Sequence, residues 1–308
     1  MAILEVKDLA ISFDQYTKGL RREQLRTIRN LDLAINEGEI VAVIGSSGSG
    51  KSLLAHAILG ILPKNAKVSG TIRYAGEVLT PARQAALRGK EIALIPQSVN
   101  FLDPLMRVGE QVRTSVRNQT NAAQAQKDIF KRYHLRPEVE KLYPFQLSGG
   151  MARRMLVSMA MVSGAKVIIA DEPTPGLDPL VMKEALCCFR ELADDGCAVM
   201  LITHDLESAL QIADRIAVFY AGTTVEVAPV ENFVGTGDAL RHPYTKALWT
   251  ALPQNQFSPI AGTQPQPNTF ISGCCFSPRC GLATSACRQE QPEMRELRGG
   301  MVRCIHAS

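Results

Sequence analysis

Residues 45–52 read Gly-Ser-Ser-Gly-Ser-Gly-Lys-Ser, a complete phosphate-loop pattern of the form G-x-x-x-x-G-K-[ST]. The pattern follows the apolar run 40–44 and precedes residues 53–59, whose composition is typical of a helix. In a strand–loop–helix unit, the loop N–H groups and the helix N-terminus point at a polyphosphate. Lys51 is expected to reach the β- and γ-phosphates, and Ser52 to bind Mg²⁺. We therefore expect a nucleoside triphosphate to be bound by Gly45, Ser46, Ser47, Gly48, Ser49, Gly50, Lys51 and Ser52.

The length and composition indicate an ordinary globular protein. The 308 residues are enough for one large domain with an additional segment. Hydrophobic residues make up 46% and charged residues 21%, and the net charge of +4 is too small to indicate a nucleic-acid partner. No run reaches the roughly 18 apolar residues of a membrane span, and the first residues do not fit a secretory signal. We expect a cytosolic protein whose eight cysteines are thiols or metal ligands rather than disulfides.

A second apolar run, residues 167–170, ends in the carboxylates Asp171 and Glu172. An apolar run without alternation is typical of a strand buried on both faces of a parallel sheet. Ligands bind beyond the carboxyl ends of such strands. Asp171 is therefore a candidate for the second Mg²⁺ anchor, and Glu172 for the base that polarises the attacking water. Two acids in this position can also be a solvated turn, but a phosphate loop in the same chain favours the catalytic interpretation.

Two further apolar runs end in polar residues. His204 follows the run 198–203, and we expect it to contact the γ-phosphate and to hold Glu172 and the water in line. Gln97 follows residues 92–96 and is expected to complete the Mg²⁺ coordination and to sense the γ-phosphate. The alternatives are a structural histidine and a plain polar residue at a strand end.

A second Gly/Ser-rich stretch, Leu147-Ser148-Gly149-Gly150-Met151, precedes a predicted helix over residues 152–161. Glycines and a serine at a helix start form an anion-binding cradle. One chain does not need two cradles for one triphosphate. Two subunits that face each other head-to-tail do, because each then closes the site of the other.

In their order and approximate spacing, these motifs resemble those of the nucleotide-binding subunits of ABC transporters, and the resemblance covers nearly the whole chain. It implies that Ser148, Gly149 and Gly150 bind the γ-phosphate held by the partner subunit. It also implies that Asp178 belongs to a loop that crosses the dimer interface. An aromatic residue near the start should stack on adenine; Phe13 fits that place, with Tyr16 as the weaker candidate.

The chain departs from the family pattern at two places. The stretch 147–151 ends in Met151 rather than the usual Gln, and Pro175-Gly176 precede Leu177-Asp178 where a Ser-Ala pair is common. Neither change removes a phosphate ligand, but both bear on the strength of the site that this stretch completes.

Three features are similar to the peptide/nickel (oligopeptide/dipeptide) importer branch: residues 142–151, the His-Pro-Tyr-Thr stretch 242–248, and a cysteine-bearing tail from Gly273. The resemblance implies an ATP-hydrolysing subunit that energises uptake of di- or oligopeptides. Nickel or metal-chelate import and a soluble ABC ATPase outside transport are the alternatives. The implied partners are a second ATPase subunit, which we expect to be a paralogue, two integral membrane permease subunits and, indirectly, an extracytoplasmic solute-binding protein. The implied location is the cytoplasmic face of the inner membrane, as a peripheral protein.

We expect an α/β fold, a P-loop NTPase of ABC type over residues 1–252 with a helical subdomain at about 98–165. Residues 98–109, with an apolar cluster around Phe101, are expected to contact a membrane subunit. Residues 253–268 contain four prolines and four glutamines, a composition that predicts a linker. A small cysteine-rich C-terminal domain is expected to complete residues 253–308.

The tail has four cysteines spaced C-x5-C-x6-C-x16-C, with Cys275 as a spare: Cys274, Cys280, Cys287 and Cys304. So short a segment with few apolar residues cannot build a sufficient core of its own. Four thiolates suit either zinc or a [4Fe–4S] cluster. Structural zinc sites use narrower pairs, and tails of this kind carry a cluster in some members of the branch, so we favour the cluster over zinc and over free thiols.

Overall fold

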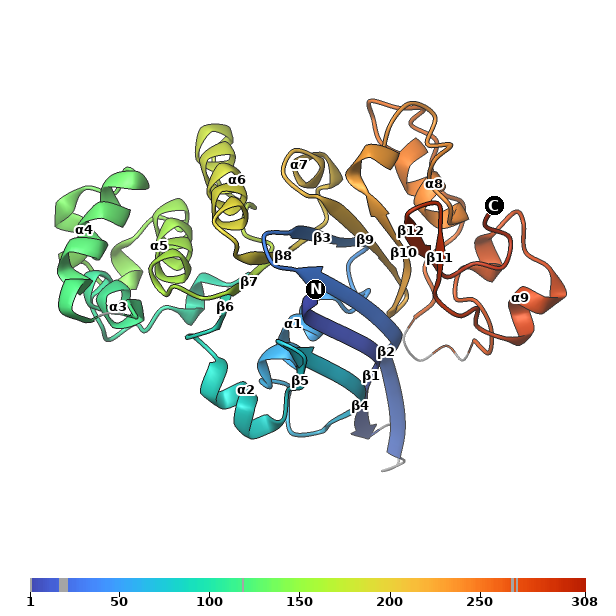
Figure 1. Cartoon of the computed structure of the whole chain (residues 1–308), viewed down its shortest axis with the longest axis horizontal. Helices are drawn as coiled ribbons and strands as arrows, with labels where there is room; N and C mark the ends of the chain where they lie inside the picture. Colours follow the sequence, from blue (N-terminus) through green and yellow to red (C-terminus); the bar gives the residue numbers. More distant parts are fainter. Residues whose placement is uncertain (1, 17–21, 118, 267–268, 270) are drawn as a thin grey trace.

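The computed structural model describes residues 2–16, 22–117, 119–266, 269 and 271–308, and for Tyr16, Arg22 and Gln119 only the backbone. It contains an eight-stranded sheet in the order β11-β12-β10-β9-β3-β8-β7-β6 (Figure 1). Its strands are β3 (Ile40–Gly45), β6 (Ile92–Ile95), β7 (Val167–Asp171), β8 (Ala198–Thr203), β9 (Arg215–Tyr220), β10 (Thr223–Pro229), β11 (Arg295–Leu297) and β12 (Gly300–Val302).

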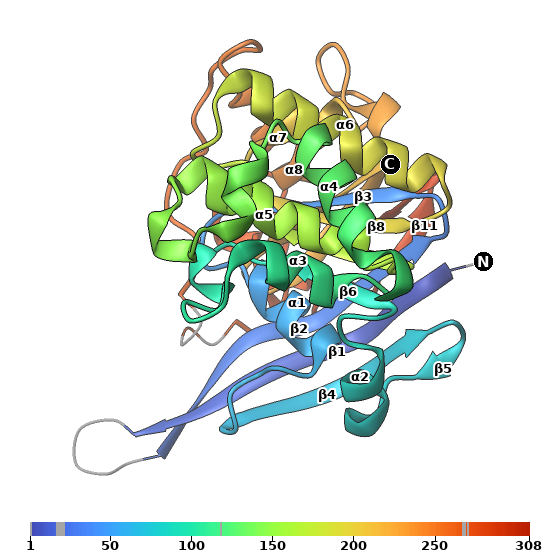
Figure 2. The ribbon, with the colours of Figure 1, turned by 90° about the vertical axis from the view of Figure 1, so that its left-hand side faces the viewer.

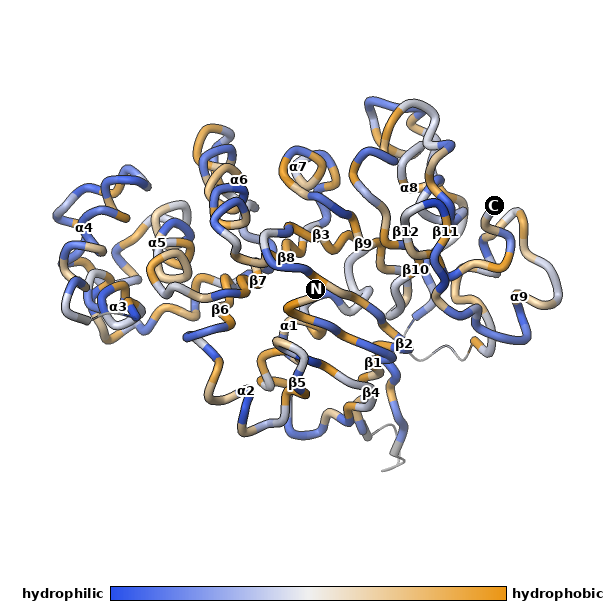
Figure 3. Tube along the Cα trace, viewed as in Figure 1, coloured by the Kyte–Doolittle hydropathy of each residue, from blue (hydrophilic) through white to orange (hydrophobic). Residues whose placement is uncertain are grey.

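The central strands of this sheet are parallel and buried. β3 pairs in parallel with β8 and β9, and β7 with β6 and β8. Every residue of β3, β7 and β8 is buried, as the unalternating apolar runs predicted. On β3, Ile40, Ala42 and Ile44 face one core, while Val41 and Val43 face another. The sheet therefore separates two hydrophobic layers, and the colouring of Figure 3 shows the apolar residues concentrated along these strands.

A smaller antiparallel sheet covers one face of the large one. Its order is β2-β1-β4-β5, from β1 (Ala2–Tyr16), β2 (Arg22–Asn36), β4 (Ala66–Tyr74) and β5 (Glu77–Val78). Helix α1 (Lys51–Leu59) packs between the two sheets through Leu54, Ile58 and Leu59. α2 (Pro81–Leu87) follows β5.

The other face is covered by helices. α3 (Val108–Ser115), α4 (Ala122–Arg132) and α5 (Gly149–Val162) gather at one end of the molecule (Figures 1 and 2), in the region where the sequence predicted a helical subdomain. α6 (Pro179–Asp194) and α7 (Leu206–Leu210) lie nearer the centre of the view. No helix in the described ranges is both long and apolar enough to cross a membrane.

The C-terminal segment lies at the opposite end and adds α8 (Pro243–Thr250), α9 (Ser285–Gln289), β11 and β12. β12 pairs with β10, Glu226 opposite Val302 and Val227 opposite Met301. The tail thus extends the sheet of the main body, and the expected separate cysteine-rich domain is not confirmed.

Candidate nucleotide site

The loop 45–52 leaves β3 and enters α1, as its pattern required. Gly50 caps α1 with φ 97°, a left-handed conformation that favours glycine. At Gly45 a Cβ atom would lie 2.5 Å from the carbonyl oxygen of Phe219, so only glycine fits beside β9. Both glycines are therefore required by the path of the backbone around the loop.

Lys51 is folded back into the loop. Its Nζ donates to the carbonyl oxygens of Gly45, at 2.7 Å, and Ser46, at 3.1 Å. Burial lowers the pKa of Lys51, while Glu172 and Asp171 oppose that shift. A lysine held on loop carbonyls can exchange these partners for phosphate oxygens.

Asp171 ends β7 and is buried. Burial raises the pKa of its carboxyl, and a hydrogen bond from Ser52 opposes the rise. Within the part of the chain that the structure describes, its Oδ1 has no hydrogen-bond partner. An orphaned carboxylate oxygen beside a hydroxyl is a donor set that suits Mg²⁺.

Both the side chain and the backbone N–H of Glu172 form hydrogen bonds. Its carboxylate lies 2.9 Å, through each oxygen, from Nδ1 of His204, and its N–H donates to the carbonyl of Ile202 at 2.9 Å. The backbone adopts φ 48°, an uncommon left-handed conformation for a residue with a side chain. The structure thus brings the two predicted catalytic residues into direct contact.

Arg153 is a site residue that the sequence analysis did not single out. From α5 its guanidinium donates to the carbonyl oxygen of Glu172 at 2.6 Å. Burial lowers the pKa of Arg153, and the charge of Glu172 opposes the shift. Its position just after the stretch 147–151 was the available signal, but the contact exists only because α5 docks beside the end of β7.

A cleft of about 580 Å³, a size within the range of small-molecule sites, lies between the phosphate loop and the pair Glu172 and His204. Asp171 and Arg153 are not among its described lining residues. Gln97 from the end of β6 lies in it, opposite residues of the phosphate loop. Thr27 of β2 is a further member that sequence reasoning missed. The lining residues are Thr27, Ser47, Gly48, Gly50, Lys51, Ser52, Leu53, Gln97, Glu172, Pro175 and His204.

Several predicted ligands lie outside this cleft. Ser148 caps α5, its hydroxyl accepting from the N–H of Met151 at 3.2 Å, and Gly149 and Gly150 begin the helix. Asp178 caps α6 and accepts from the N–H groups of Leu180 and Val181. None of these four residues is among the described lining residues. Their roles toward a partner's nucleotide stay predictions.

The predicted adenine contact also stays untested. Phe13 lies on β1 between Leu25 of β2 and Ala66 of β4. It is partly buried against the core under the small sheet, and it is not among the lining residues of the cleft. The side chain of Tyr16 falls outside the described residues.

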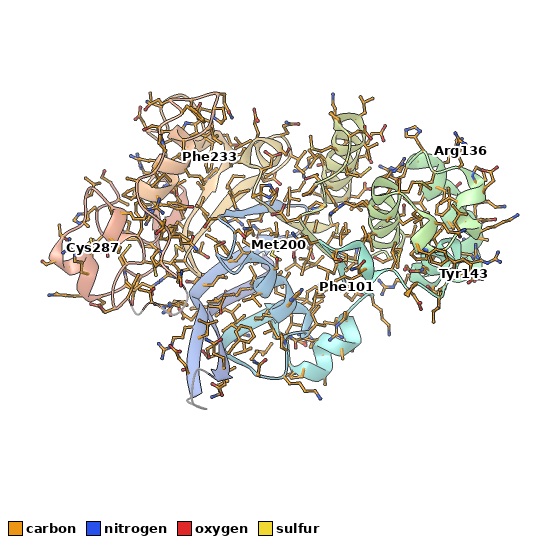
Figure 4. The ribbon with its side chains drawn as sticks, turned by 180° about the vertical axis from the view of Figure 1, so that it is seen from behind. Phe101, Arg136, Tyr143, Met200, Phe233 and Cys287 are labelled. Carbon is orange, nitrogen blue, oxygen red and sulfur yellow. The ribbon has the colours of Figure 1, made fainter. Side chains whose placement is uncertain are left out.

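The tail cysteines lie in one region but do not form a metal centre in this arrangement. Cys274 donates its N–H to the carbonyl of Cys287 at 2.7 Å, and burial raises the pKa of the Cys274 thiol to about 11. Burial also raises the pKa of Cys304, with small additions from Cys280 and Cys287. Over the described ranges, no group of three or more His, Cys, Asp or Glu side chains converges as a metal site. Figure 4 shows Cys287 at the end of the molecule opposite Arg136 and Tyr143.

Residues 28–175 match the family model of ABC transporters, and residues 225–287 match that of the oligopeptide/dipeptide transporter C-terminal region. The dipeptide transport ATP-binding protein DppD of Escherichia coli (strain K12) is 32% identical over 318 residues, 97% of this chain and 95% of the relative. The chain belongs to the ABC transporter family. DppD of Haemophilus influenzae (31%, 99% of this chain, 95% of the relative) and the oligopeptide transport ATP-binding protein AppD of Bacillus subtilis (31%, 98% and 96%) are similar over the same extent.

The fold agrees with this assignment. A solved dimeric structure of the bacterial ABC transporter cassette MJ0796 superposes with a TM-score of 0.64, covering 74% of this chain and 98% of that one at 24% identity. Another, described as the ATP-binding subunit of an ABC transporter, gives 0.62 over 75% and 91% at 23% identity. These superpositions confirm the P-loop cassette fold expected from the motifs. Its membership of the ABC transporter family makes the protein an ATPase of the ABC type.

Proposed function

We propose that this ABC ATPase hydrolyses ATP to drive the uptake of dipeptides or oligopeptides through membrane permease subunits. The observation that carries the proposal is the match of residues 225–287 to the C-terminal region of oligopeptide/dipeptide transporters. That region follows a complete phosphate loop, and the named relatives run the length of the chain. Peptide import is therefore favoured over ABC functions that lack this C-terminal region.

The residues in and around the cleft have separate tasks in this proposal. Lys51 and the loop N–H groups bind the β- and γ-phosphates. Ser52 and Asp171, with Gln97, would hold a magnesium ion that shields the phosphate charge. Glu172 polarises the attacking water, and His204, at 2.9 Å, orients the carboxylate. Arg153 fixes the backbone of Glu172 by donating to its carbonyl oxygen.

We further propose a head-to-tail dimer of ATPase subunits. Ser148, Gly149 and Gly150 would contact the γ-phosphate bound by the partner, and Asp178 would lie at the interface. The exposure of Ser148 and Gly149 in this chain supports the idea. We expect the partner to be a paralogue, with Met151 making the two sites unequal. Subunit identification in the native complex checks this: two copies of this chain without a second ATPase would contradict it.

Permease contact is assigned to residues 98–109. Phe101, labelled in Figure 4, is 58% exposed, and Leu105 is 87% exposed. Large apolar side chains so exposed in a loop are typical of a surface that a partner covers. Membrane association would then be peripheral, at the cytoplasmic face.

For the tail we propose a [4Fe–4S] cluster, with zinc as the alternative, held by Cys274, Cys280, Cys287 and Cys304. Four cysteines lie in a segment that has little hydrophobic core, and this supports a metal centre that cross-links the segment. The thiols would have to approach one another more closely than they do in the present arrangement. Iron, sulfide and zinc analysis of anaerobically purified protein decides it: about four irons per chain supports the cluster, one zinc supports the alternative, and no metal rejects both.

Transport itself tests the main proposal. The chain is co-expressed with the candidate permease subunits, purified as a complex and reconstituted into proteoliposomes with its solute-binding protein. We expect ATPase activity stimulated by peptide-loaded binding protein, and loss of that activity in the Glu172→Gln complex. Stimulation by nickel complexes instead of peptides, or failure to purify with any membrane subunit, would contradict peptide import.

A further inference from the structure

The phosphate loop is held from outside by the linker. The Ser46 hydroxyl donates to the side-chain carbonyl of Gln264, a residue 218 positions later in the chain. The backbone carbonyl of the same Ser46 accepts from Nζ of Lys51 at 3.1 Å and from the N–H of Ser49 at 3.2 Å. Any displacement of Ser46 therefore changes the position of both groups, which belong to the phosphate-binding surface.

Gln264 is itself positioned by the tail. Arg279 donates to the linker carbonyls of Ala261, at 2.7 Å, and Ile260, at 3.1 Å. A third bond reaches the hydroxyl of Tyr220 at 3.2 Å, and the guanidinium lies 5.9 Å from the ring centroids of both Tyr220 and Phe276. One arginine thus ties the segment 274–280 to the linker just before Gln264.

An aromatic cluster anchors this arginine to the ATPase body. Tyr220, Tyr244 and Phe276 are all buried, with ring centroids 4.5–5.3 Å apart. Tyr220 ends β9, directly after Phe219, which pairs with Gly45 at the start of the phosphate loop. Burial raises the pKa of Tyr244, and Arg279 and the Ser46 hydroxyl reduce that effect. A continuous series of contacts therefore connects the tail to the phosphate loop.

The linker supports the loop without filling the nucleotide cleft. Gly48 and Thr27 line that cleft on one side and a narrow crevice under Gln264 and Gln266 on the other. Among the residues that the structure describes, none from 260–266 lines the cleft itself. Arg29 of β2 also holds the chain just after the linker, by donating to the carbonyl of Thr269 at 2.9 Å. The linker thus lies behind the loop, where it restrains the loop without competing with a ligand.

We propose that Gln264, held by Arg279, is a positioning residue that preorganises the phosphate loop through Ser46 and so raises the affinity for nucleotide. A flexible glycine-rich loop loses conformational freedom on binding phosphates, and a restraint that fixes it beforehand removes part of that cost. A single hydrogen bond contributes about 0.5–1.5 kcal/mol, which corresponds to a roughly two- to tenfold change in affinity. Displacing residues 274–280 should then weaken nucleotide binding from a distance.

The test uses the full-length chain and Mg·ADP as the probe, with dissociation constants from titration calorimetry. We expect Gln264→Ala and Ser46→Ala each to weaken binding about three- to tenfold, and the double variant to be no weaker than Ser46→Ala alone, because both remove one hydrogen bond. Gln256→Ala, an exposed glutamine of the same linker, is the matched control and should change binding less than twofold. Wild-type affinity in Gln264→Ala, or multiplied effects in the double variant, would overturn the proposal.

Arg279→Ala extends the test to the tail, with the exposed Arg288→Ala as its control. We expect weaker Mg·ADP binding for Arg279→Ala, and in the assembled transporter a raised KM for ATP with kcat within about twofold, since the chemistry at Glu172 is untouched. A fall in kcat at constant KM would contradict a positioning role. The inference rests on the proposed phosphate site, and Lys51→Ala separates the two. If Lys51→Ala binds Mg·ADP normally, the assignment of the phosphate site is wrong. If Lys51→Ala fails to bind while Gln264→Ala binds normally, only the positioning role of Gln264 is wrong.

Discussion

Glu172 combines a backbone conformation that few residues adopt with contacts on every polar group. A left-handed conformation in a residue with a side chain costs about 1–3 kcal/mol and persists only where the surroundings enforce it. Here the enforcing contacts come from Ile202, Arg153 and His204. We interpret the strained geometry as the means by which β7 can end and still direct a carboxylate into the cleft.

Replacing that carboxylate should separate binding from hydrolysis. In Glu172→Gln the loop and Lys51 still hold ATP, while the polariser of the water is lost, so we expect ATP-bound closed dimers and a loss of turnover of at least about a hundredfold. Lys51→Ala should lose nucleotide affinity as well. Nucleotide retention and phosphate release are measured on the purified complex, with the partner ATPase silenced by its own mutation. Turnover at the wild-type rate in that background would contradict the role of Glu172.

Arg153 should affect catalysis more than binding. Arg153→Ala removes the bond to the carbonyl of Glu172, so the carboxylate loses its fixed direction; a displacement of about 1 Å can cost up to a hundredfold in rate. We expect kcat to fall by about ten- to a hundredfold with KM for ATP within about threefold. Arg136→Ala, at an exposed position in the helical region, is the control. A raised KM at unchanged kcat would show that Arg153 acts on nucleotide binding instead.

Sequence reasoning identified the residues that stand at strand ends. Asp171, Glu172, His204 and Gln97 each follow a short apolar run, and parallel strands bring such ends to one edge of the sheet. Arg153 could not be assigned in this way, because its partner is 19 residues away across a helix–strand contact that no local pattern encodes. Thr27 was missed for the same reason, since β2 reaches the phosphate loop only through the packing of the small sheet.

At the scale of elements, the two long N-terminal strands were the least predictable. β1 and β2 pair over most of their length, but register shifts interrupt the pairing between Val6 and Leu9 and again between Leu9 and Ile11. Each shift breaks the alternation of apolar and polar residues from which a strand is predicted. The buried strands β3, β7 and β8 have no such interruptions, and their apolar runs predicted them correctly.

Helix α8 begins at the stretch His242-Pro243. Glu226, fully buried on β10, accepts from the N–H groups of Arg241 and His242, at 2.9 and 2.8 Å, and pairs with the Arg241 guanidinium at 3.2 Å. Nδ1 of His242 accepts from the N–H of Tyr244 at 3.0 Å and so caps the helix. This cap requires a neutral imidazole acceptor.

The cap should make stability depend on pH. Burial lowers the pKa of His242 from 6.5 to about 3. Between these values the unfolded chain binds a proton that the folded chain does not, so folding stability falls as the pH falls below about 6.5. From pH 7 to pH 5, the protonation of this one histidine in the unfolded chain should lower the free energy of unfolding by about 2 kcal/mol.

Urea unfolding of the full-length chain at the two pH values measures the effect. His242→Asn keeps an acceptor for the cap without a titrating ring, and this variant should lose about 2 kcal/mol less than the wild type over the same interval. Equal losses in both proteins would show that other groups determine the acid sensitivity.

At the scale of the whole molecule, the tail is joined to both sheets by Arg303. Its guanidinium donates to the carbonyls of Asn30, at 2.9 Å, and Thr224, at 3.2 Å, and forms an ion pair with Asp32. Asn30 and Asp32 belong to β2 and Thr224 to β10. The sequence predicted a linker and an appended cysteine-rich unit; it did not predict this junction, because the partners are separated by up to 273 residues.

Removing Arg303 should therefore destabilise the whole fold. Arg303→Ala removes the ion-pair partner of the partly buried Asp32 and one donor from each of the Asn30 and Thr224 carbonyls, and losing such contacts costs about 1–3 kcal/mol. Thermal unfolding of the full-length chain, compared with the exposed Arg288→Ala, measures the loss. A change below about 0.5 kcal/mol would mean that β12 holds the tail in place without the arginine.

The same junction determines when the protein can finish folding during synthesis. Asp32 leaves the ribosome 271 residues before its partner Arg303, a delay of roughly 15–50 s at ordinary translation rates. Once β10 (Thr223–Pro229) is made, its edge stays open until β12 (Gly300–Val302) follows, roughly 4–15 s later at the same rates, and an open edge pairs readily with foreign strands. The nascent chain thus passes through a late stage of synthesis in which this edge is open to wrong pairing.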